Sequence, residues 1–175
     1  NVLQKKLETP SDYTALFEAL NSTAPGAAGL TFLPYVLGER APIWNSHASG
    51  VFFGMRGYHE QAHFTRAVIE GISTSLYDIT HNMIESGLDI KQIHVSGGFV
   101  HSEKWLQLLT DLFGKKVFLI NTPDASATGA AFLALKDIGV ISDYLQLKPK
   151  EIKEFLPDAA SMAAYRELFL RYRKI

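Results

Sequence analysis

Two adjacent glycines, Gly97 and Gly98, interrupt the chain between an apolar run and a helix-like pattern, and they constrain the fold more than any other feature. The apolar residues at 93–95 predict a strand that ends at the glycines. Adjacent glycines let the backbone turn sharply and let a ligand approach where a Cβ would block it. A helix that begins just after them presents unpaired N–H groups and a partial positive charge, which suit a phosphate. The pattern therefore predicts half of a nucleotide site, although an ordinary tight turn explains the same residues.

Short apolar runs alternate with helix-period patterns along the rest of the chain, which predicts an α/β layer architecture. We expect strands over residues 30–33, 51–55, 90–95 and 117–120, and helices over residues 11–20, 59–86, 102–113, 126–138 and 160–172. Residues 21–29 read as a turn-rich loop. Residues 38–50 predict a long ordered loop, which in a compact domain is more often functional than slack.

The longest predicted helix, over residues 59–86, has three informative features. Its apolar residues form one stripe: Val68, Ile72, Leu76, Ile79 and Met83. Small residues such as Gly71 allow close packing against a sheet or another helix. Arg66 and Glu70 are four residues apart, so an ordinary ion pair along the helix explains both.

The composition excludes several classes of protein. The chain has 175 residues, of which 47% are hydrophobic and 20% charged, and this composition is typical of a globular domain. A net charge of −1, without a long Lys/Arg cluster, does not indicate a nucleic-acid partner. With no cysteine, a disulfide framework and a thiolate metal site are excluded. We find no apolar run of membrane-spanning length and no secretory signal, and we expect a cytoplasmic domain cut from a longer protein.

Three stretches carry candidate functional residues, each with an ordinary structural explanation beside it. Ser102 is placed to cap the helix over 102–113 or to offer its hydroxyl to a ligand at the same mouth. Asp124 is placed to cap the next helix, whose small residues at 129–131 favour close helix–helix packing and are compatible with packing on a partner domain. Trp44 follows Glu39 and Arg40, which form either a solvated pair or, with the Trp, the wall of a polar pocket.

Taken together, three motifs resemble the FGGY family of carbohydrate kinases in order and spacing. They are Gly-Glu-Arg-Ala-Pro-x-Trp at 38–44, Ser-Gly-Gly-x-x-x-Ser-x-x-Trp-x-Gln-x-x-x-Asp-x-x-Gly at 96–114, and Asp-x-x-x-x-Gly-Ala-Ala at 124–131. The resemblance covers roughly residues 30–135. It implies an actin-like ATPase fold, in which two ribonuclease-H-like domains, each a mixed sheet with flanking helices, close on a cleft.

The resemblance also implies the roles of particular residues. Residues 1–175 correspond to the C-terminal, nucleotide-side domain alone, and the N-terminal domain is absent. In the family, the segment matching residues 96–102 lies against the adenosine and phosphates of ATP, which implies nucleotide binding by Gly97, Gly98 and Ser102. Some relatives have Asn at the position of Ser102. The catalytic Asp, the sugar contacts and the Mg²⁺ carboxylates come mostly from the N-terminal domain, so the fragment alone is expected to be inactive.

The implied activity is ATP-dependent phosphorylation of a sugar or sugar-acid hydroxyl. The amino-acid sequence at residues 33–42 and 97–103 is most similar to that of gluconate kinases, and xylulose kinases are the alternative. The implied partners are ATP and ADP, the sugar and the protein's own N-terminal domain, with a homodimer left open. An alternative of another class is a non-catalytic actin-like domain that binds a nucleotide or a protein, because no catalytic base or metal-ligand set is identifiable in these residues.

Overall fold

The structure is a computed structural model, and it describes residues 17–122, 124–147 and 150–175. In chain order its strands and helices are β1 (Thr31–Leu33), β2 (Val51–Phe53), α2 (Gln61–Glu85), β3 (Gln92–Val95), α3 (Glu103–Phe113), β4 (Lys116–Ile120), α4 (Ala125–Asp137), β5 (Glu151–Phe155) and α5 (Ala159–Tyr172). The connections of the described chain include the 3₁₀ turns η2 (Ala27–Gly29), η3 (Gly98–His101) and η4 (Tyr144–Leu147). Most of the helix predicted over 11–20 falls outside the described residues, although residues 17–22 are helical. No helix of the described chain is long and apolar enough to cross a membrane.

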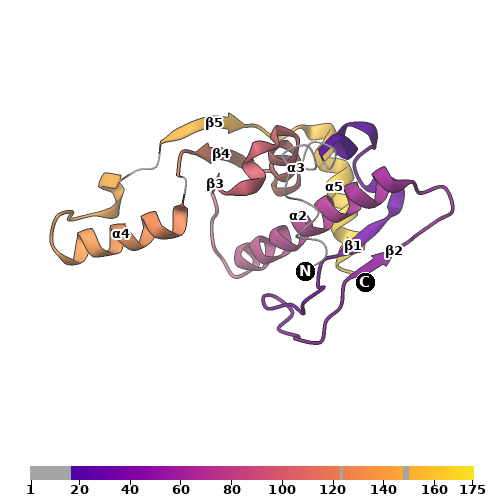
Figure 1. Cartoon of the computed structure of the whole chain (residues 1–175), viewed down its shortest axis with the longest axis horizontal. Helices are drawn as coiled ribbons and strands as arrows, with labels where there is room; N and C mark the ends of the chain where they lie inside the picture. Colours follow the sequence, from indigo (N-terminus) through magenta and orange to yellow (C-terminus); the bar gives the residue numbers. More distant parts are fainter. Residues whose placement is uncertain (1–16, 123, 148–149) are drawn as a thin grey trace.

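The strands form two small sheets, flanked by the helices (Figure 1). β1 and β2 pair antiparallel, with Phe32 opposite Phe52. The second sheet has the order β3-β4-β5, in which β3 and β4 run parallel and β5 runs antiparallel to β4. A mixed sheet with flanking helices is confirmed. The sequence patterns do not predict β5, because four of its five residues are exposed and three are charged.

Helix α2 packs directly on the backbone of β1, and Gly71 makes this contact possible. A Cβ at Gly71 would lie 2.3 Å from the carbonyl oxygen of Phe32, closer than a real side chain tolerates. The predicted close packing of this helix is therefore confirmed. The predicted apolar stripe is not its buried face, since Ile72, Leu76 and Met83 are 37–46% exposed. The buried face instead carries Ile69 together with small and polar residues such as Ser73 and Arg66, and these two have hydrogen-bond partners on other segments.

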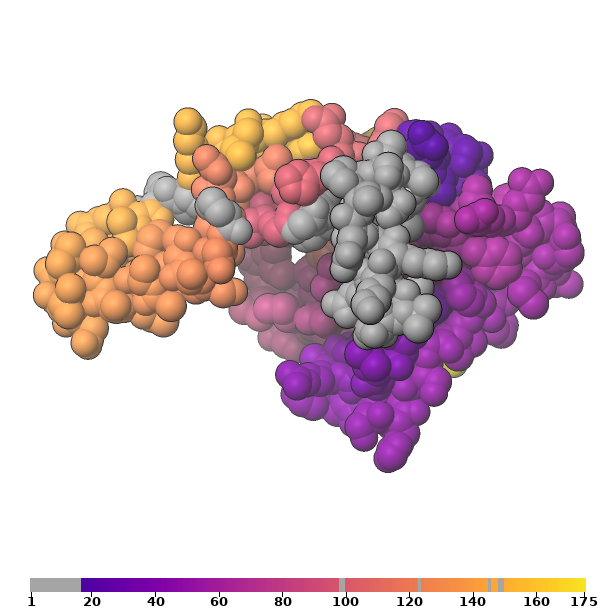
Figure 2. All heavy atoms as spheres, in the orientation of Figure 1, coloured from indigo at the N-terminus to yellow at the C-terminus, as the bar shows by residue number. Residues whose placement is uncertain are grey.

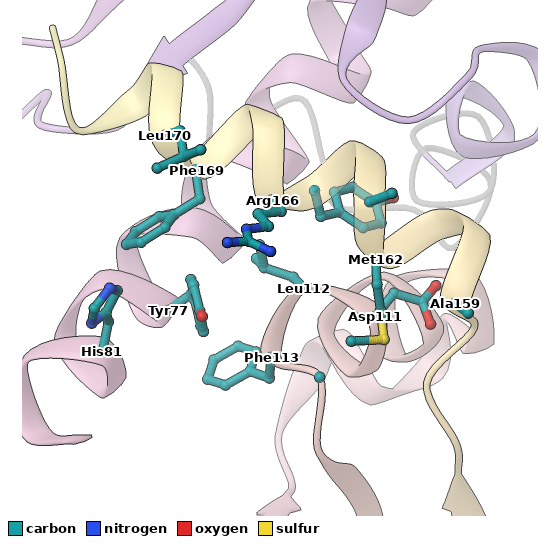
Figure 3. A pocket seen from close by; sticks show the side chains of 13 residues that line it. Tyr77, His81, Asp111, Leu112, Phe113, Ala159, Met162, Arg166, Phe169 and Leu170 are labelled. Carbon is teal, nitrogen blue, oxygen red and sulfur yellow. The ribbon is translucent and has the colours of Figure 1, made fainter. Parts of the chain in front are cut away.

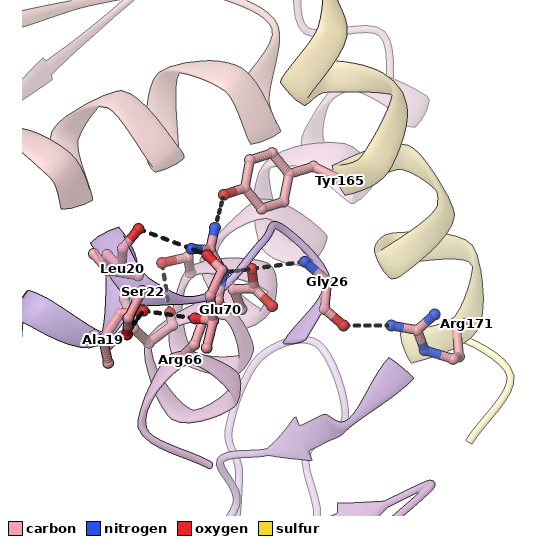
Figure 4. A network of polar contacts seen from close by, with 11 residues as sticks. Ala19, Leu20, Ser22, Gly26, Arg66, Glu70, Tyr165 and Arg171 are labelled. Carbon is pink, nitrogen blue, oxygen red and sulfur yellow. Dashed lines mark hydrogen bonds and ion pairs between the residues drawn. The ribbon is translucent and has the colours of Figure 1, made fainter. Parts of the chain in front are cut away.

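The central polar contact of the fold is the pair Arg66–Glu70 on α2, shown in Figure 4. The predicted ion pair is present, with Arg66 Nε 2.7 Å from Glu70 Oε1, but both side chains are at most 4% exposed. Glu70 Oε1 also accepts from the Gly26 N–H at 2.9 Å. Arg66 donates to three groups of other segments: the carbonyl oxygens of Leu20 and Thr23 and the hydroxyl of Tyr165. Burial raises the pKa of Glu70, while the charge of Arg66 and the Gly26 N–H oppose that rise.

Helix α3 begins and ends as the sequence predicts. The Ser102 Oγ accepts from the Trp105 N–H at 3.2 Å, and Gly114 terminates the helix with a left-handed φ of 59°. Its apolar face joins the main core, which comprises Ile69, Leu108, Leu112, Tyr165 and Leu168, with Trp105 packed at its side. The Trp105 Nε1–H donates to Ser73 Oγ at 2.8 Å and so fixes α3 to the buried face of α2.

Helix α4 lies apart from the rest of the described chain, at the end of the molecule away from β2 (Figures 1 and 2). Asp124 caps it as predicted, since its Oδ1 accepts from the Ala127 N–H at 2.9 Å. The predicted close helix–helix packing of the small residues is wrong for the described chain. No residue of α4 is buried, and a Cβ at Gly129 would meet no atom within 4 Å.

Candidate functional site

The candidate site lies at the carboxyl ends of the two parallel strands. β3 and β4 pair in register, with Val95 opposite Leu119, so the loops that leave them start at the same edge of the sheet. The first loop leads to α3 and the second to α4, and both helices therefore begin at this edge. In open α/β sheets, ligands bind in the crevice outside the carboxyl ends of the strands. Helix N-termini there favour anionic groups.

Gly97 makes the turn that follows β3. Its φ is 105°, a conformation that residues with a side chain rarely adopt, and among the described residues a Cβ at this position would meet nothing within 4 Å. The predicted sharp turn at the glycine pair is therefore confirmed at Gly97. Gly98 begins the 3₁₀ turn η3, which leads into α3. The open space in front of Gly97 leaves room for a ligand to approach the backbone.

Ser102 ends this loop and is buried, with 5% of its surface exposed. Its hydroxyl oxygen caps α3, so the structural role predicted for Ser102 is confirmed. Within the described residues the Ser102 hydroxyl donates to no carbonyl or carboxylate. Ligand binding by Gly97, Gly98 and Ser102 stays a prediction.

A hollow of about 510 Å³ opens beside the second loop. Its walls come from the end of β4, the first turns of α4 and the segment around η4, and include Asn121, Thr128, Gly129 and Lys150. The Asn121 N–H donates to the Lys150 carbonyl oxygen at 2.9 Å, which joins two of these walls. The hollow lies where the sequence predicted tight packing around Gly129. The lining is mainly apolar, and Asn121, Thr128 and Lys150 add polar groups to it.

The loop over residues 38–50 is ordered, as predicted, and a backbone bridge between Glu39 and Asn45 closes part of it. Glu39 and Asn45 exchange backbone hydrogen bonds of 2.9 Å in both directions. Glu39 Oε1 accepts from the Arg40 N–H and both residues remain accessible, in keeping with the solvated interpretation. Trp44 is 76% exposed, so it walls no enclosed polar site here.

Gln107 and Asp111, which belong to the second motif, have anchoring roles that the sequence analysis missed. Asp111 Oδ1 accepts from Gln107 Nε2 and from the Asp158 N–H, both at 2.8 Å. Gln107 Nε2 also donates to the Leu156 carbonyl oxygen at 2.9 Å. These bonds hold α3 against the connection between β5 and α5. Burial raises the pKa of Asp111, and the Asp158 N–H opposes that rise. The four-residue spacing of Gln107 and Asp111 was the available signal.

Comparison with known proteins identifies the family. Residues 2–137 match the model of the C-terminal domain of the FGGY family of carbohydrate kinases. The chain belongs to this family. It is 31% identical to xylulose kinase of Bacillus subtilis over 98% of its length, and 36% identical to gluconokinase of Bacillus subtilis over 75% of its length. A solved structure of xylulose kinase from Lactobacillus acidophilus matches 95% of the chain with a TM-score of 0.85 at 32% identity.

These matches show the fold of the chain, and they show that it corresponds to only a part of the length of its relatives. The fold is the actin-like ATPase fold of the FGGY kinases, as the resemblance implied. The chain spans 35% of the length of the B. subtilis xylulose kinase, 26% of the gluconokinase and 34% of the solved structure. The described residues hold no group of three or more Asp, Glu, His or Cys that is arranged to bind a metal ion. We therefore assign no residue of this chain to Mg²⁺.

Proposed function

We propose that the full-length protein transfers a phosphoryl group from ATP to a hydroxyl of a sugar or sugar acid. Residues 1–175 would be its C-terminal domain and the nucleotide-side wall of its cleft. The observation that carries this proposal is the parallel β3–β4 edge in an FGGY chain, where a left-handed Gly97 faces open space at the start of α3. The proposal places ATP binding and ADP release at this edge and the reaction in the cytoplasm.

The residues at this edge supply binding and orientation. Phosphoryl transfer depends mainly on positioning and on stabilising the charge of the transferring group. The turn at Gly97 exposes backbone to the nucleotide, and the N-terminus of α3 favours its phosphates. The Ser102 hydroxyl is held by the α3 cap and would donate its hydrogen to the nucleotide. We expect the catalytic carboxylate, the sugar contacts and the Mg²⁺ ligands from an N-terminal domain, and closure of the two domains excludes water.

For the sugar, we propose gluconate, with xylulose as the alternative. The wording of residues 33–42 and 97–103 supports gluconate, whereas xylulose kinase matches a larger share of the chain. The specificity constants kcat/KM of the full-length protein for the two substrates, with ATP and Mg²⁺, decide between them. We expect the larger value for gluconate. A larger value for xylulose would show that the sequence around this edge does not report the sugar, while activity on neither substrate nor on other sugars would overturn the kinase proposal.

A pair of cap variants tests the proposed site separately from stability. Ser102→Ala and Asp158→Ala each remove the side chain that caps a helix, α3 in the first case and α5 in the second. Both should lower Tm, the first by an amount equivalent to about 1 kcal/mol. Only Ser102→Ala should raise the KM for ATP, with the KM for the sugar unchanged. If Ser102→Ala lowers Tm without changing the KM for ATP, Ser102 is a cap alone and leaves the proposed site.

A further inference from the structure

A second hollow lies away from the β3–β4 edge, between α5 and the C-terminal halves of α2 and α3 (Figure 3). Its volume is about 580 Å³, within the range of pockets that bind small molecules. None of its lining residues belongs to the loops that follow β3 and β4. The proposed kinase function therefore leaves this hollow without a role.

Aromatic rings form one wall of this hollow. Tyr77 packs edge-to-face on Phe113 and on Phe169, with ring centroids 5.3 and 4.7 Å apart. His81 extends the wall, its ring centroid 5.1 Å from that of Phe169. Tyr77, Phe113 and His81 remain partly exposed, so their rings are available to a ligand. Such a wall favours a flat apolar or aromatic group.

Arg166 brings a positive charge to the same hollow. Figure 3 shows its guanidinium directed toward Tyr77 and Phe169. Within residues 17–122, 124–147 and 150–175, Arg166 has neither an ion pair nor a hydrogen bond. The neighbouring arginines differ, since Arg171 donates to Thr31 at 2.8 Å and Arg173 lies 3.5 Å from the carboxylate of Asp78. Within the described residues, the N–H donors of the Arg166 guanidinium are therefore not taken up by the protein.

The acidic residue of the hollow does not cancel this charge. Asp111 lies beside Met162 and Ala159 in Figure 3, on another part of the wall from Arg166. Its Oδ1 is already held by Gln107 and by the Asp158 N–H, and burial raises its pKa. Burial also raises the pKa of Tyr77, while the charge of Arg166 lowers it, so the guanidinium acts on the ring wall.

We propose that this hollow is a binding site for a small planar aromatic carboxylate. Its ring would stack against the partly exposed rings of Tyr77, Phe113 and His81, and its carboxylate would take a paired hydrogen bond from Arg166. The guanidinium fork matches a carboxylate in geometry and charge. The proposal concerns a site separate from the nucleotide edge, and it holds whichever sugar the protein phosphorylates.

The test measures binding of 2-naphthoate to the full-length protein by isothermal titration calorimetry, in the presence of saturating ADP and gluconate. The neutral analogue 2-naphthamide has the same rings without the charge, and cyclohexanecarboxylate has the charge without the rings. We expect saturable binding of 2-naphthoate and binding at least tenfold weaker for both analogues. A tenfold ratio corresponds to about 1.4 kcal/mol.

Three variants locate the site. Arg166→Gln removes the charge and should weaken 2-naphthoate binding at least tenfold. Ala163→Glu places a carboxylate one turn before Arg166, pairs the guanidinium within the helix and should weaken binding similarly. Lys174→Gln removes the same charge beyond the end of α5 and should leave binding unchanged. Far-UV circular dichroism and the sugar kcat/KM should be the same for all three variants, which excludes unfolding as the cause.

Several results would overturn the proposal. One is the absence of saturable binding at millimolar 2-naphthoate, and another is equal binding of 2-naphthamide, which would make the hollow a purely apolar surface. Unchanged affinity in Arg166→Gln would place the ligand elsewhere. A crystal structure of the full-length protein in which its own residues fill the hollow would exclude a ligand. A failure of the kinase assays leaves these measurements unaffected, so the two proposals fail separately.

Discussion

Two glycines in helix interiors, Gly71 of α2 and Gly129 of α4, predict opposite effects of the same substitution. Gly→Ala in a helix interior stabilises by roughly 0.5–1 kcal/mol where space permits, because alanine has the higher helix propensity. Gly129 meets this condition, since its Cβ would meet nothing within 4 Å. Gly129→Ala should therefore raise the free energy of unfolding by up to about 1 kcal/mol.

Gly71→Ala adds the same methyl group against a backbone. The new Cβ would stand 2.3 Å from the Phe32 carbonyl oxygen and 3.1 Å from the Phe32 carbonyl carbon and Cβ. Normal contact requires α2 to move about 1 Å from β1, and overpacking of this kind costs typically 1–3 kcal/mol. The gain in helix propensity offsets about 1 kcal/mol. We expect the overpacking cost at the upper end of this range, because a shift of α2 also disturbs the buried Arg66–Glu70 pair. The net loss in the free energy of unfolding is then about 2 kcal/mol.

The assay is thermal unfolding of the full-length protein followed by circular dichroism, with hydrogen exchange of the α2 amides as a local measurement. At roughly 2–4 °C per kcal/mol for a domain of 150–250 residues, the unfolding transition of the domain that contains these residues should fall by roughly 4–8 °C in Gly71→Ala and rise by roughly 1–4 °C in Gly129→Ala. Faster exchange in α2 should accompany only the first variant. A similar Tm in both variants would refute the argument from the α2–β1 contact. A marked loss in Gly129→Ala would show that another part of the full-length protein covers α4.

Two further predictions concern buried charges. Arg66→Ala should lower the free energy of unfolding by about 3–5 kcal/mol because it leaves the Glu70 carboxylate buried without its cation. The double variant Arg66→Met/Glu70→Leu should recover only part of that loss in urea titrations, because it removes the buried charge but leaves the partners of both side chains, such as the Gly26 N–H and the Thr23 carbonyl oxygen, without their hydrogen bonds. Equal losses in the two variants would contradict the charge argument. The pKa of Asp111 is raised in the folded state, so deprotonation of this carboxyl opposes folding. The wild type should therefore lose stability relative to Asp111→Asn as the pH rises from the ordinary pKa of 3.8 through the higher folded pKa. Unfolding curves of the two proteins from pH 3.5 to 6.5 that show no such divergence would contradict the burial of a charge there.

Local signals in the sequence predicted the elements that local chemistry controls. Ser102 and Gly114 fix both ends of α3 because a cap and a left-handed glycine each act within a few residues. β5 escaped prediction because four of its five residues are exposed and three are charged, so it lacks the apolar pattern of a strand. The α2 stripe failed for a related reason, since Ser73 and Arg66 are buried by partners on α3 and α5 that periodicity does not reveal.

The candidate site was predictable in its backbone and less so in its surroundings. The turn at Gly97 follows from the glycine pair itself, and the family follows from three motifs in order. The exposed surface of α4 could not be predicted from the sequence. A run of small residues indicates that another segment can pack closely against the helix, but it does not identify that segment. The hollow beside Gly129 combines β4, α4 and the segment around η4, and no single stretch of sequence carries that combination.

The two most deeply buried carboxylates among the described residues, those of Glu70 and Asp111, are anchors of the fold. A raised carboxylate pKa is typical of a general acid or base, so both residues invite a catalytic interpretation. Each, however, accepts a backbone N–H from a distant segment, Gly26 in one case and Asp158 in the other, and each is held by a side chain four residues away on its own helix. Neither lies on the loops that follow β3 and β4. Their carboxylates tie the helices α2 and α3 to neighbouring segments of the chain. The raised pKa values of these two carboxyls therefore reflect burial where helices contact neighbouring segments. The proposed nucleotide edge consists of backbone and hydroxyl groups and does not include them.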